Sequence, residues 1–162
     1  AHGFPHRFGS KGGAEQVVAS HRTRAMDGVS FSGGETMQQA LDLLDLIRLL
    51  KSARSEISIG MYSGYTEREL DSGHFWTRYG IAQETRSRIW EDINQLLDFA
   101  VLGRFVASRP SRLPMRTSAN QVLRLFSGRY REEHFRPLEF EVHIESEGLV
   151  QITGFPLAGL PI

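Results

Sequence analysis

The chain alternates short apolar runs with longer stretches whose apolar residues recur at helical spacing. Residues 28–32, 57–62 and 98–102 form the short runs, and each is followed within a few residues by a glycine, as is typical of strands in an α/β sheet. Between them, residues 37–54 and 85–97 carry wide apolar faces, which are typical of helices packed on a sheet. The pattern therefore predicts an α/β layer structure with mostly parallel strands.

Each predicted helix has its own set of side chains for the core. In the first, a polar residue recurs every third position, and the positions expected to be buried are Leu41, Leu43, Leu44, Leu46, Ile47, Leu49 and Leu50. In the second, one face holds Ile89, Trp90, Ile93, Leu96 and Leu97. Thr66 and Glu69 have the spacing of a capping box, so a helical turn is expected to begin between these helices.

The two ends of the chain differ from this central pattern. Residues 1–16 are rich in glycine and lack an apolar period, which indicates a loop or detached arm, and residues 15–26 have modest helical character. Near the other end, residues 138–144 and 149–153 flank a polar turn and predict a β-hairpin. Residues 121–126 fit either a strand or a short helix.

These segments divide the chain into three parts of one folded unit. Residues 1–26 form an irregular arm with a short helix, residues 27–137 form the α/β core, and residues 138–162 form a hairpin and tail of the same domain. A length of 162 residues suits a single hydrophobic core.

Composition narrows the classes of function. Nineteen basic residues balance nineteen acidic ones, so no overall field favours nucleic acid or an anionic membrane. No apolar run approaches the roughly 20 residues that span a bilayer, and we expect a cytoplasmic protein. The six histidines have no metal-binding spacing, and there is no nucleophile elbow or phosphate-binding glycine loop. The absence of cysteine excludes disulfides and thiolate-bound clusters within these residues.

One segment departs from the even charge balance. Eight arginines lie between Arg104 and Arg136, against two glutamates in the same stretch. Arg109, Arg112 and Arg116 are candidates for a surface that docks an acidic partner. A solvated arginine face explains the same residues equally well.

The loop after the first predicted strand is the main candidate binding site. Ligands of parallel α/β sheets collect beyond the carboxyl ends of the strands. There Gly33 and Gly34 allow a ligand to approach the backbone, and Glu35 offers an anionic acceptor, which favours an ammonium group over a phosphate. The alternative is a tight strand-to-helix turn whose glutamate favours the helix N-terminus.

Two further loops offer polar groups. Tyr62, Ser63 and Tyr65 follow the second predicted strand and suit a hydroxylated or carboxylated ligand, although an exposed turn would look the same. The run of residues 117–121, which contains Asn120, offers paired donors and acceptors, and an asparagine turn explains it nearly as well.

Taken together, these segments resemble the radical S-adenosylmethionine enzymes, above all the activating enzymes of anaerobic ribonucleotide reductase. The resemblance covers about residues 27–156. It rests on DGVSFSGGE at 27–35, ISIGMYSGYT at 57–66, LLDFAVLGRF at 96–105, TSANQ at 117–121 and EVHIESEGLVQITGFP at 141–156.

The resemblance implies a partial (β/α) barrel with a C-terminal hairpin, in which Gly33, Gly34 and Glu35 bind the amino group of S-adenosylmethionine. Ser63 would contact the ribose or carboxylate of this cofactor, and Asn120 would line the same cavity. Such enzymes use a 4Fe-4S cluster and an electron donor to cleave the cofactor reductively. The resulting 5′-deoxyadenosyl radical abstracts hydrogen, in activases from a glycine of a glycyl radical enzyme such as anaerobic ribonucleotide reductase.

Two departures qualify the resemblance. Thr36 stands where the family motif commonly has proline, and threonine is a competent helix cap. The family's C-x-x-x-C-x-x-C loop is missing, since the chain has no cysteine, and we expect the barrel to be truncated, with that piece outside this sequence. The chain alone is then expected to be inactive and to bind S-adenosylmethionine weakly, and no catalytic residue is assigned.

Two alternatives stay open. One is a degenerate, non-catalytic relative that acts as a protein-docking or nucleotide-binding module. The other is a nucleotide-binding protein of unrelated ancestry, which would show the strand order of a dinucleotide-binding fold. Truncation would also expose a sheet edge beside residues 28–32, which predicts oligomerisation or low solubility.

Overall fold

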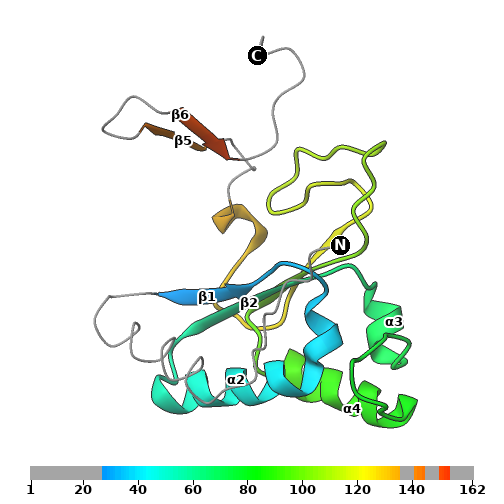
Figure 1. Cartoon of the computed structure of the whole chain (residues 1–162). Coiled ribbons are helices and arrows are strands. Elements are labelled where there is room, and N and C mark those ends of the chain that lie inside the picture. The colour runs from blue at the N-terminus through cyan, green and yellow to red at the C-terminus, as the bar shows by residue number, and fades with distance from the viewer. Residues whose placement is uncertain (1–26, 136–140, 145–149, 154–162) are drawn as a thin grey trace.

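A computed structural model describes residues 27–135, 141–144 and 150–153. Its main feature is a four-stranded sheet with the order β1-β2-β3-β4, formed by β1 (Gly28–Phe31), β2 (Ser58–Ser63), β3 (Phe99–Leu102) and β4 (Val122–Leu125) (Figure 1). The first three strands are parallel, and β4 runs antiparallel to β3. The predicted α/β class is confirmed, and over the described ranges the sheet is open.

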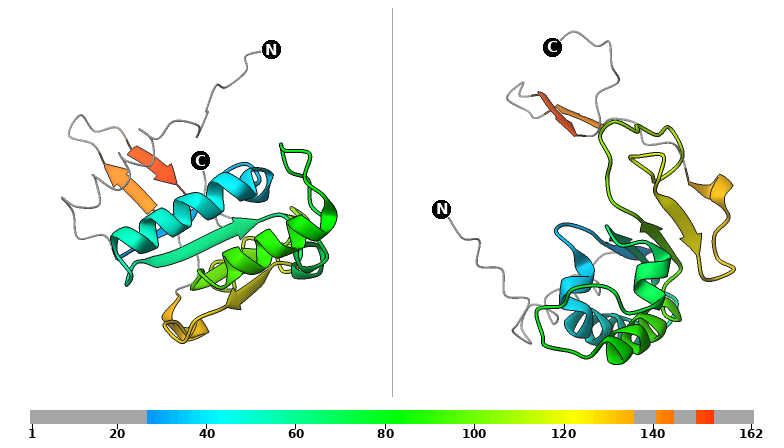
Figure 2. Two further views of the ribbon diagram at one scale, coloured as in Figure 1. Left: turned by 90° about the horizontal axis from the view of Figure 1, so that it is seen from below. Right: turned by 90° about the vertical axis from the view of Figure 1, so that its right-hand side faces the viewer.

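Helices cover one face of this sheet. A 3₁₀ turn, η1 (Thr36–Gln39), leads into α2 (Ala40–Ala53), and α3 (Glu67–Asp71) and α4 (Gln83–Asn94) lie between β2 and β3 in the chain. α2 and α4 lie side by side beneath the sheet (Figures 1 and 2). The capping box of α3 is present as predicted, with Thr66 and Glu69 bonded reciprocally.

The hydrophobic core lies between the helices and the sheet. It includes Met37, Ile47, Ile59, Met61 and Trp90, all at most 1% exposed. Two of the leucines predicted to be buried are not: Leu41 is 38% and Leu49 is 40% exposed. At 3.6 residues per turn both lie on the side of α2 away from Leu43, Ile47 and Leu50, so the apolar residues extend round the helix beyond its buried face.

The opposite face of the sheet carries an aromatic cluster. The Phe99 ring lies directly over Gly60, where an added Cβ would come within 2.2 Å of Phe99 Cζ, so only glycine fits without displacing the ring. Tyr130 and Phe135 both pack edge-on against Phe99, and the Tyr130 hydroxyl donates to Ser58 Oγ at 2.9 Å. The segment that carries them includes the short helix η2 (Glu132–His134).

The predicted elements otherwise match closely. Residues 121–126 contain the strand β4, and the predicted hairpin is present as β5 (Glu141–Ile144) and β6 (Val150–Thr153), paired antiparallel. The arm and short helix predicted for residues 1–26 lie outside the described residues, as does the hairpin turn.

β1 stands at one end of the four-strand order. Among the described residues it pairs only with β2, so its other side is an edge, as predicted for residues 28–32. The expected oligomerisation stays a prediction. Within the same described ranges, no helix combines the length and apolar character needed to span a membrane.

Candidate functional site

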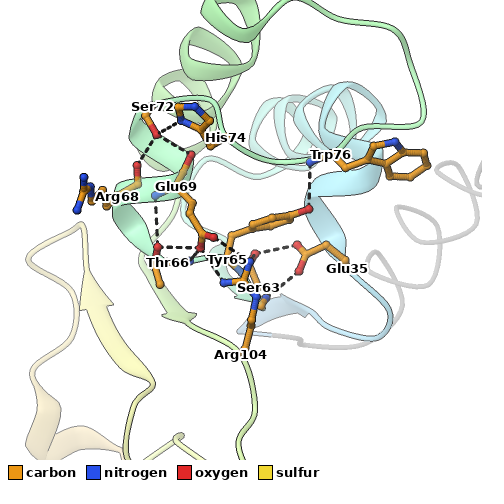
Figure 3. Close-up of polar contacts among 11 residues, drawn as sticks. Glu35, Ser63, Tyr65, Thr66, Arg68, Glu69, Ser72, His74, Trp76 and Arg104 are labelled. Carbon is orange, nitrogen blue, oxygen red and sulfur yellow. Dashed lines mark hydrogen bonds and ion pairs between the residues drawn. The ribbon is translucent and has the colours of Figure 1, made fainter.

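The loops that follow the three parallel strands come together at one edge of the sheet. Gly33, Gly34 and Glu35 follow β1, Ser63 ends β2, and Arg104 lies two residues after β3. Ser63 is tied to the end of β3 by a hydrogen bond from the Gly103 amide to the Ser63 carbonyl, 3.0 Å. Four of the predicted cofactor residues, the three after β1 and Ser63, therefore lie at this edge, and Figure 3 shows Ser63 bonded to Glu35.

The Glu35 carboxylate joins the loops after β1 and β2. Its Oε1 accepts hydrogen bonds from the Ser63 hydroxyl at 2.7 Å and the Met37 amide at 3.0 Å. Its Oε2 accepts from the Gly64 amide at 2.8 Å. Both oxygens thus face internal donors, and a carboxylate suits this position better than an amide, because each oxygen must accept.

This arrangement sharpens the argument from sequence. The bond to Met37 makes Glu35 the cap of η1, so the alternative explanation, a glutamate at a helix start, is partly right. The bonds to Ser63 and Gly64 reach 28 and 29 residues along the chain, which a local turn does not require. Glu35 therefore fixes the shape of the site whether or not it touches a ligand.

The glycine pair remains open to solvent. Gly33 has φ 92° and Gly34 has φ 58°, conformations that residues with a side chain rarely adopt. A Cβ built on either residue meets no atom within 4 Å, so the glycines are required by backbone conformation and not by crowding. Their exposed peptide groups supply carbonyl acceptors beside an anionic side chain.

Thr36 has a different role from the one expected. Glu35, and not Thr36, provides the side-chain cap of the 3₁₀ turn, whereas the Thr36 hydroxyl donates to the Tyr62 carbonyl at 2.7 Å. This is a second bond between the loop after β1 and strand β2. Threonine in place of proline therefore adds to the hydrogen bonds by which Glu35 connects the loop after β1 to β2.

The loop after β2 is braced from the other side. The Ser63 hydroxyl accepts from the Tyr65 amide at 3.1 Å, and the Tyr65 hydroxyl accepts from the Trp76 amide at 3.0 Å. Figure 3 shows the Tyr65 hydroxyl bonded to the Trp76 amide. These bonds continue the network from Glu35 into the segment between α3 and α4.

Sequence reasoning missed the ion pair at this edge. Arg104 makes two hydrogen bonds to Glu69, of 2.9 and 2.8 Å, and its guanidinium lies 5.5 Å from the centre of the Tyr65 ring. The hydrogen bonds from Arg104 and from the Thr66 amide lower the pKa of Glu69 to about 2, and the same pair raises the pKa of Arg104. The rule applied to the other strand ends would have identified Arg104, since it follows a buried strand and a glycine.

Asn120 is bonded to the backbone of Arg104 and not to the Glu35 loop. Its Nδ2 donates to the Arg104 carbonyl at 2.7 Å, while its Oδ1 is buried and accepts no hydrogen bond within the described ranges. No hydrogen bond in those ranges joins Asn120 to Gly33, Gly34 or Glu35. Contact between Asn120 Oδ1 and a ligand would require the loop of residues 104–121 to move, because that atom is covered.

The three arginines expected to dock a partner are not equivalent. Arg116 pairs with Glu132, and only 12% of its side chain is exposed. Arg109 and Arg112 are exposed and form no ion pair among the described residues. Only the latter two remain available for a partner.

Hydrogen-bond acceptors dominate the chemistry of this edge. It combines peptide carbonyls, a carboxylate and a serine hydroxyl, and Arg104 is the cation beside it. No group of three or more His, Cys, Asp or Glu side chains in the described part of the chain is arranged to hold a metal ion.

Comparison with protein families gives a match over most of this fold. Residues 6–124, which span β1 to the third residue of β4, match the sequence model of the 4Fe-4S single cluster domain family. The chain belongs to this family. The match supports the iron–sulfur, radical S-adenosylmethionine-like character that the motifs predicted. Searches of curated proteins and of solved structures gave no match.

The residues of this family member do not fit a 4Fe-4S cluster. Such clusters are held by cysteine thiolates, with histidine as an occasional substitute. The 162 residues contain no cysteine, and the six histidines form no suitable set in the sequence. No step of cluster chemistry can therefore be assigned to residues of this chain.

Proposed function

We propose that this chain is the cofactor-binding portion of a radical S-adenosylmethionine activating enzyme. In the intact protein, S-adenosylmethionine bound at a 4Fe-4S cluster would be cleaved reductively, and hydrogen would be abstracted from a glycine of a partner such as anaerobic ribonucleotide reductase. Membership of the 4Fe-4S single cluster domain family supports the cofactor class. The cluster ligands would come from residues outside this sequence.

The proposal rests on the exposed Gly33–Gly34 pair, whose neighbour Glu35 is hydrogen-bonded to the end of β2. The amino group of the cofactor would lie against the peptide carbonyls of Gly33 and Gly34, close to the Glu35 carboxylate. Glu35 has one bond on Oε2 and two on Oε1, so Oε2 can accept another. Ser63, which donates to Glu35, would position this carboxylate. Arg104, beside Gly64, would face the cofactor carboxylate.

The strand order supports a barrel arc over a doubly wound sheet. In a doubly wound fold the order reverses at a switch point, and helices lie on both faces. Here β1, β2 and β3 are neighbours in the sheet in the same order as in the sequence. When every right-handed connection steps the same way across the sheet, all its helices lie on one face, as α2 and α4 do here. This arrangement disfavours an unrelated dinucleotide-binding fold, and we propose that the sheet is part of a (β/α) barrel.

The test uses the gene product as encoded, including any residues before Ala1. The protein is reconstituted anaerobically with iron and sulfide, supplied with S-adenosylmethionine and dithionite, and assayed for 5′-deoxyadenosine. Gly33→Ala should lower the rate about tenfold or more, because alanine at φ 92° is strained and the loop carbonyls must move. The matched control is Gly80→Ala, whose Cβ meets nothing within 4 Å and whose φ is not positive.

The outcome separates the proposal from its main alternative. An encoded C-x-x-x-C-x-x-C segment, iron uptake and 5′-deoxyadenosine that depends on Gly33 would support the activase. A gene product without cysteine that takes up no iron would instead support a degenerate relative that acts as a binding module. Calorimetry on the 162-residue chain should show weak S-adenosylmethionine binding, and submicromolar affinity would contradict the need for a cluster.

A further inference from the structure

The loop of residues 104–121 has a defined shape, because Gln121 clasps its two ends. Gln121 Oε1 accepts from the amides of Thr117 and Ser118 at 2.9 and 3.0 Å, and Nε2 donates to the Gly103 carbonyl at 3.1 Å. The run of polar residues at 117–121 therefore closes the loop on itself. Its role in this structure is to hold the loop that contains the arginines.

Contacts within the loop fix it further. The Ala119 amide donates to the Arg109 carbonyl at 2.8 Å, next to a β-bridge between Pro110 and Ser118. Ser118 is fully buried and its hydroxyl accepts from the Val106 amide at 3.2 Å. The loop extends beyond the ends of the strands on the side away from the helices, as Figures 1 and 2 show. It is therefore a shaped projection near the candidate site.

Most arginines from residue 104 onward are already engaged. Each of the following has a carboxylate within ion-pair distance: Arg104, Arg116, Arg124, Arg129 and Arg131. Arg109 and Arg112 differ, since they lie on the projecting loop and form no ion pair within the described ranges. No acidic residue occurs between Asp98 and Glu132 in the sequence, so the loop supplies no counter-charge of its own.

An exposed apolar side chain lies next to these two cations. Leu113 is 48% exposed, adjacent to Arg112, and its amide is held by Ser111 Oγ at 3.0 Å. Interfaces combine an apolar contact with arginines that find partners only on binding, and arginine is enriched among their dominant contacts. A rigid loop also loses little conformational entropy on association.

We propose that Arg109, Arg112 and Leu113 form a docking surface for an acidic segment of a partner protein. This inference rests on the proposed function, in which the partner is the glycyl radical enzyme. Charge complementarity favours an anionic partner. A protein is favoured over nucleic acid because only two arginines of the projecting loop are unpaired within the described ranges, the chain has no net charge, and Leu113 offers an apolar contact that phosphates would not use.

The test measures binding of the gene product to purified anaerobic ribonucleotide reductase of the same organism, by biolayer interferometry at low and high salt. Arg109→Glu/Arg112→Glu should weaken binding about tenfold or more and remove most of the salt dependence. The matched control is Arg68→Glu/Arg88→Glu, which makes the same change in charge. Arg68 and Arg88 are exposed on α3 and α4 and form no ion pair in the described part of the chain.

Equal losses in the two double variants would overturn the proposal, because they would reflect net charge alone. An unchanged affinity of the loop variant would overturn it too, as would arginine-dependent binding to duplex DNA in its place. The same variants are assayed for 5′-deoxyadenosine. If wild-type protein forms 5′-deoxyadenosine but does not bind the reductase, the docking surface fails while the cofactor assignment stands.

Discussion

Two carboxylates, Glu35 and Asp98, join neighbouring segments at opposite ends of the same sheet. Glu35 receives a serine hydroxyl and two amides, from Ser63, Gly64 and Met37. Asp98 receives the Ser127 hydroxyl at 2.6 Å and the Ile59 amide at 2.8 Å. The donor sets are alike, so the chemistry of the carboxylate does not decide which one belongs to a binding site.

The surroundings of the two carboxylates differ. Asp98 is 4% exposed, at the amino end of β3, with Lys51 and Arg129 within 3.8 and 3.4 Å. Glu35 is partly exposed, at the carboxyl end of β1, and lies beside the open glycine pair. Asp98 is surrounded by protein groups on all sides, whereas Glu35 keeps an acceptor position beside solvent. A binding role thus depends on what is left open around a carboxylate.

The largest expected effect comes from removing the Asp98 carboxylate. Asp98→Ala leaves the buried Ile59 amide without its acceptor and removes the carboxylate that Lys51 and Arg129 face, of which Arg129 keeps a second carboxylate, Glu56, at 3.8 Å. We expect a loss of about 3 kcal/mol in the free energy of unfolding, measured by urea denaturation. Asp92→Asn is the control, because that ion pair with Arg48 is about half exposed and should change stability by less than about 0.5 kcal/mol.

A second variant separates charge from hydrogen bonding at this position. Asp98→Asn retains a side-chain oxygen that could still accept from the Ile59 amide, and the new NH2 group could donate to a rotated Ser127 hydroxyl. This variant should therefore lose less stability than Asp98→Ala. If both substitutions lower the free energy of unfolding equally and only slightly, Asp98 does not stabilise the sheet as proposed.

The next effect is smaller and local, at Glu35. Glu35→Gln keeps the size of the side chain but points an NH2 group at either Gly64 or Met37, each of which offers only a donor. We expect a loss of about 1 kcal/mol in stability. Amide hydrogen exchange of Gly64 should become faster, whereas exchange in the core strand β3 should change much less.

Ser63→Ala serves as the matched comparison for this variant. It removes one hydroxyl donor and leaves both backbone bonds to Glu35 in place, so Gly64 should stay better protected than in Glu35→Gln. Loss of protection throughout the sheet in Glu35→Gln would contradict a local role. Glu35 would then support the whole sheet, as Asp98 is expected to do.

The sequence predicts the elements of this fold well, because periodicity reports which face of each element is buried. The strands β1 and β3 and the helices α2 and α4 follow from it within a few residues. Periodicity carries no information on direction, so the antiparallel course of β4 was not foreseen. It also overestimates burial on a helix that is apolar over most of its circumference, as the exposed Leu41 and Leu49 show.

The candidate site was only half accessible from sequence, for a physical reason. Gly33, Gly34 and Glu35 are neighbours in the chain, so a local pattern reveals them. The partners of Glu35 lie 28 and 29 residues away, and the Asp98 side chain bonds to groups 39 and 29 residues away. Asp98 was assigned to the third strand and given no role, since nothing local distinguishes it from a polar residue at a strand start.

The smallest effect concerns a third carboxylate, Glu69, whose partner Arg104 is 59% exposed. The pKa of Glu69 is lowered from 4.5 to about 2, so its ionised form stabilises the fold above the unfolded pKa, and this contribution is lost as pH falls from 4.5 toward 2. Solvent screening limits this contribution to about 1 kcal/mol or less.

Glu69→Gln retains a capping-box residue, and should therefore flatten the acid limb of the stability curve without unfolding α3. Glu91→Gln, at an exposed position of α4, is the control. An acid limb of equal steepness in both variants would show that the Arg104–Glu69 pair contributes nothing measurable, which would leave Glu35 as the one carboxylate of this edge that matters to the fold.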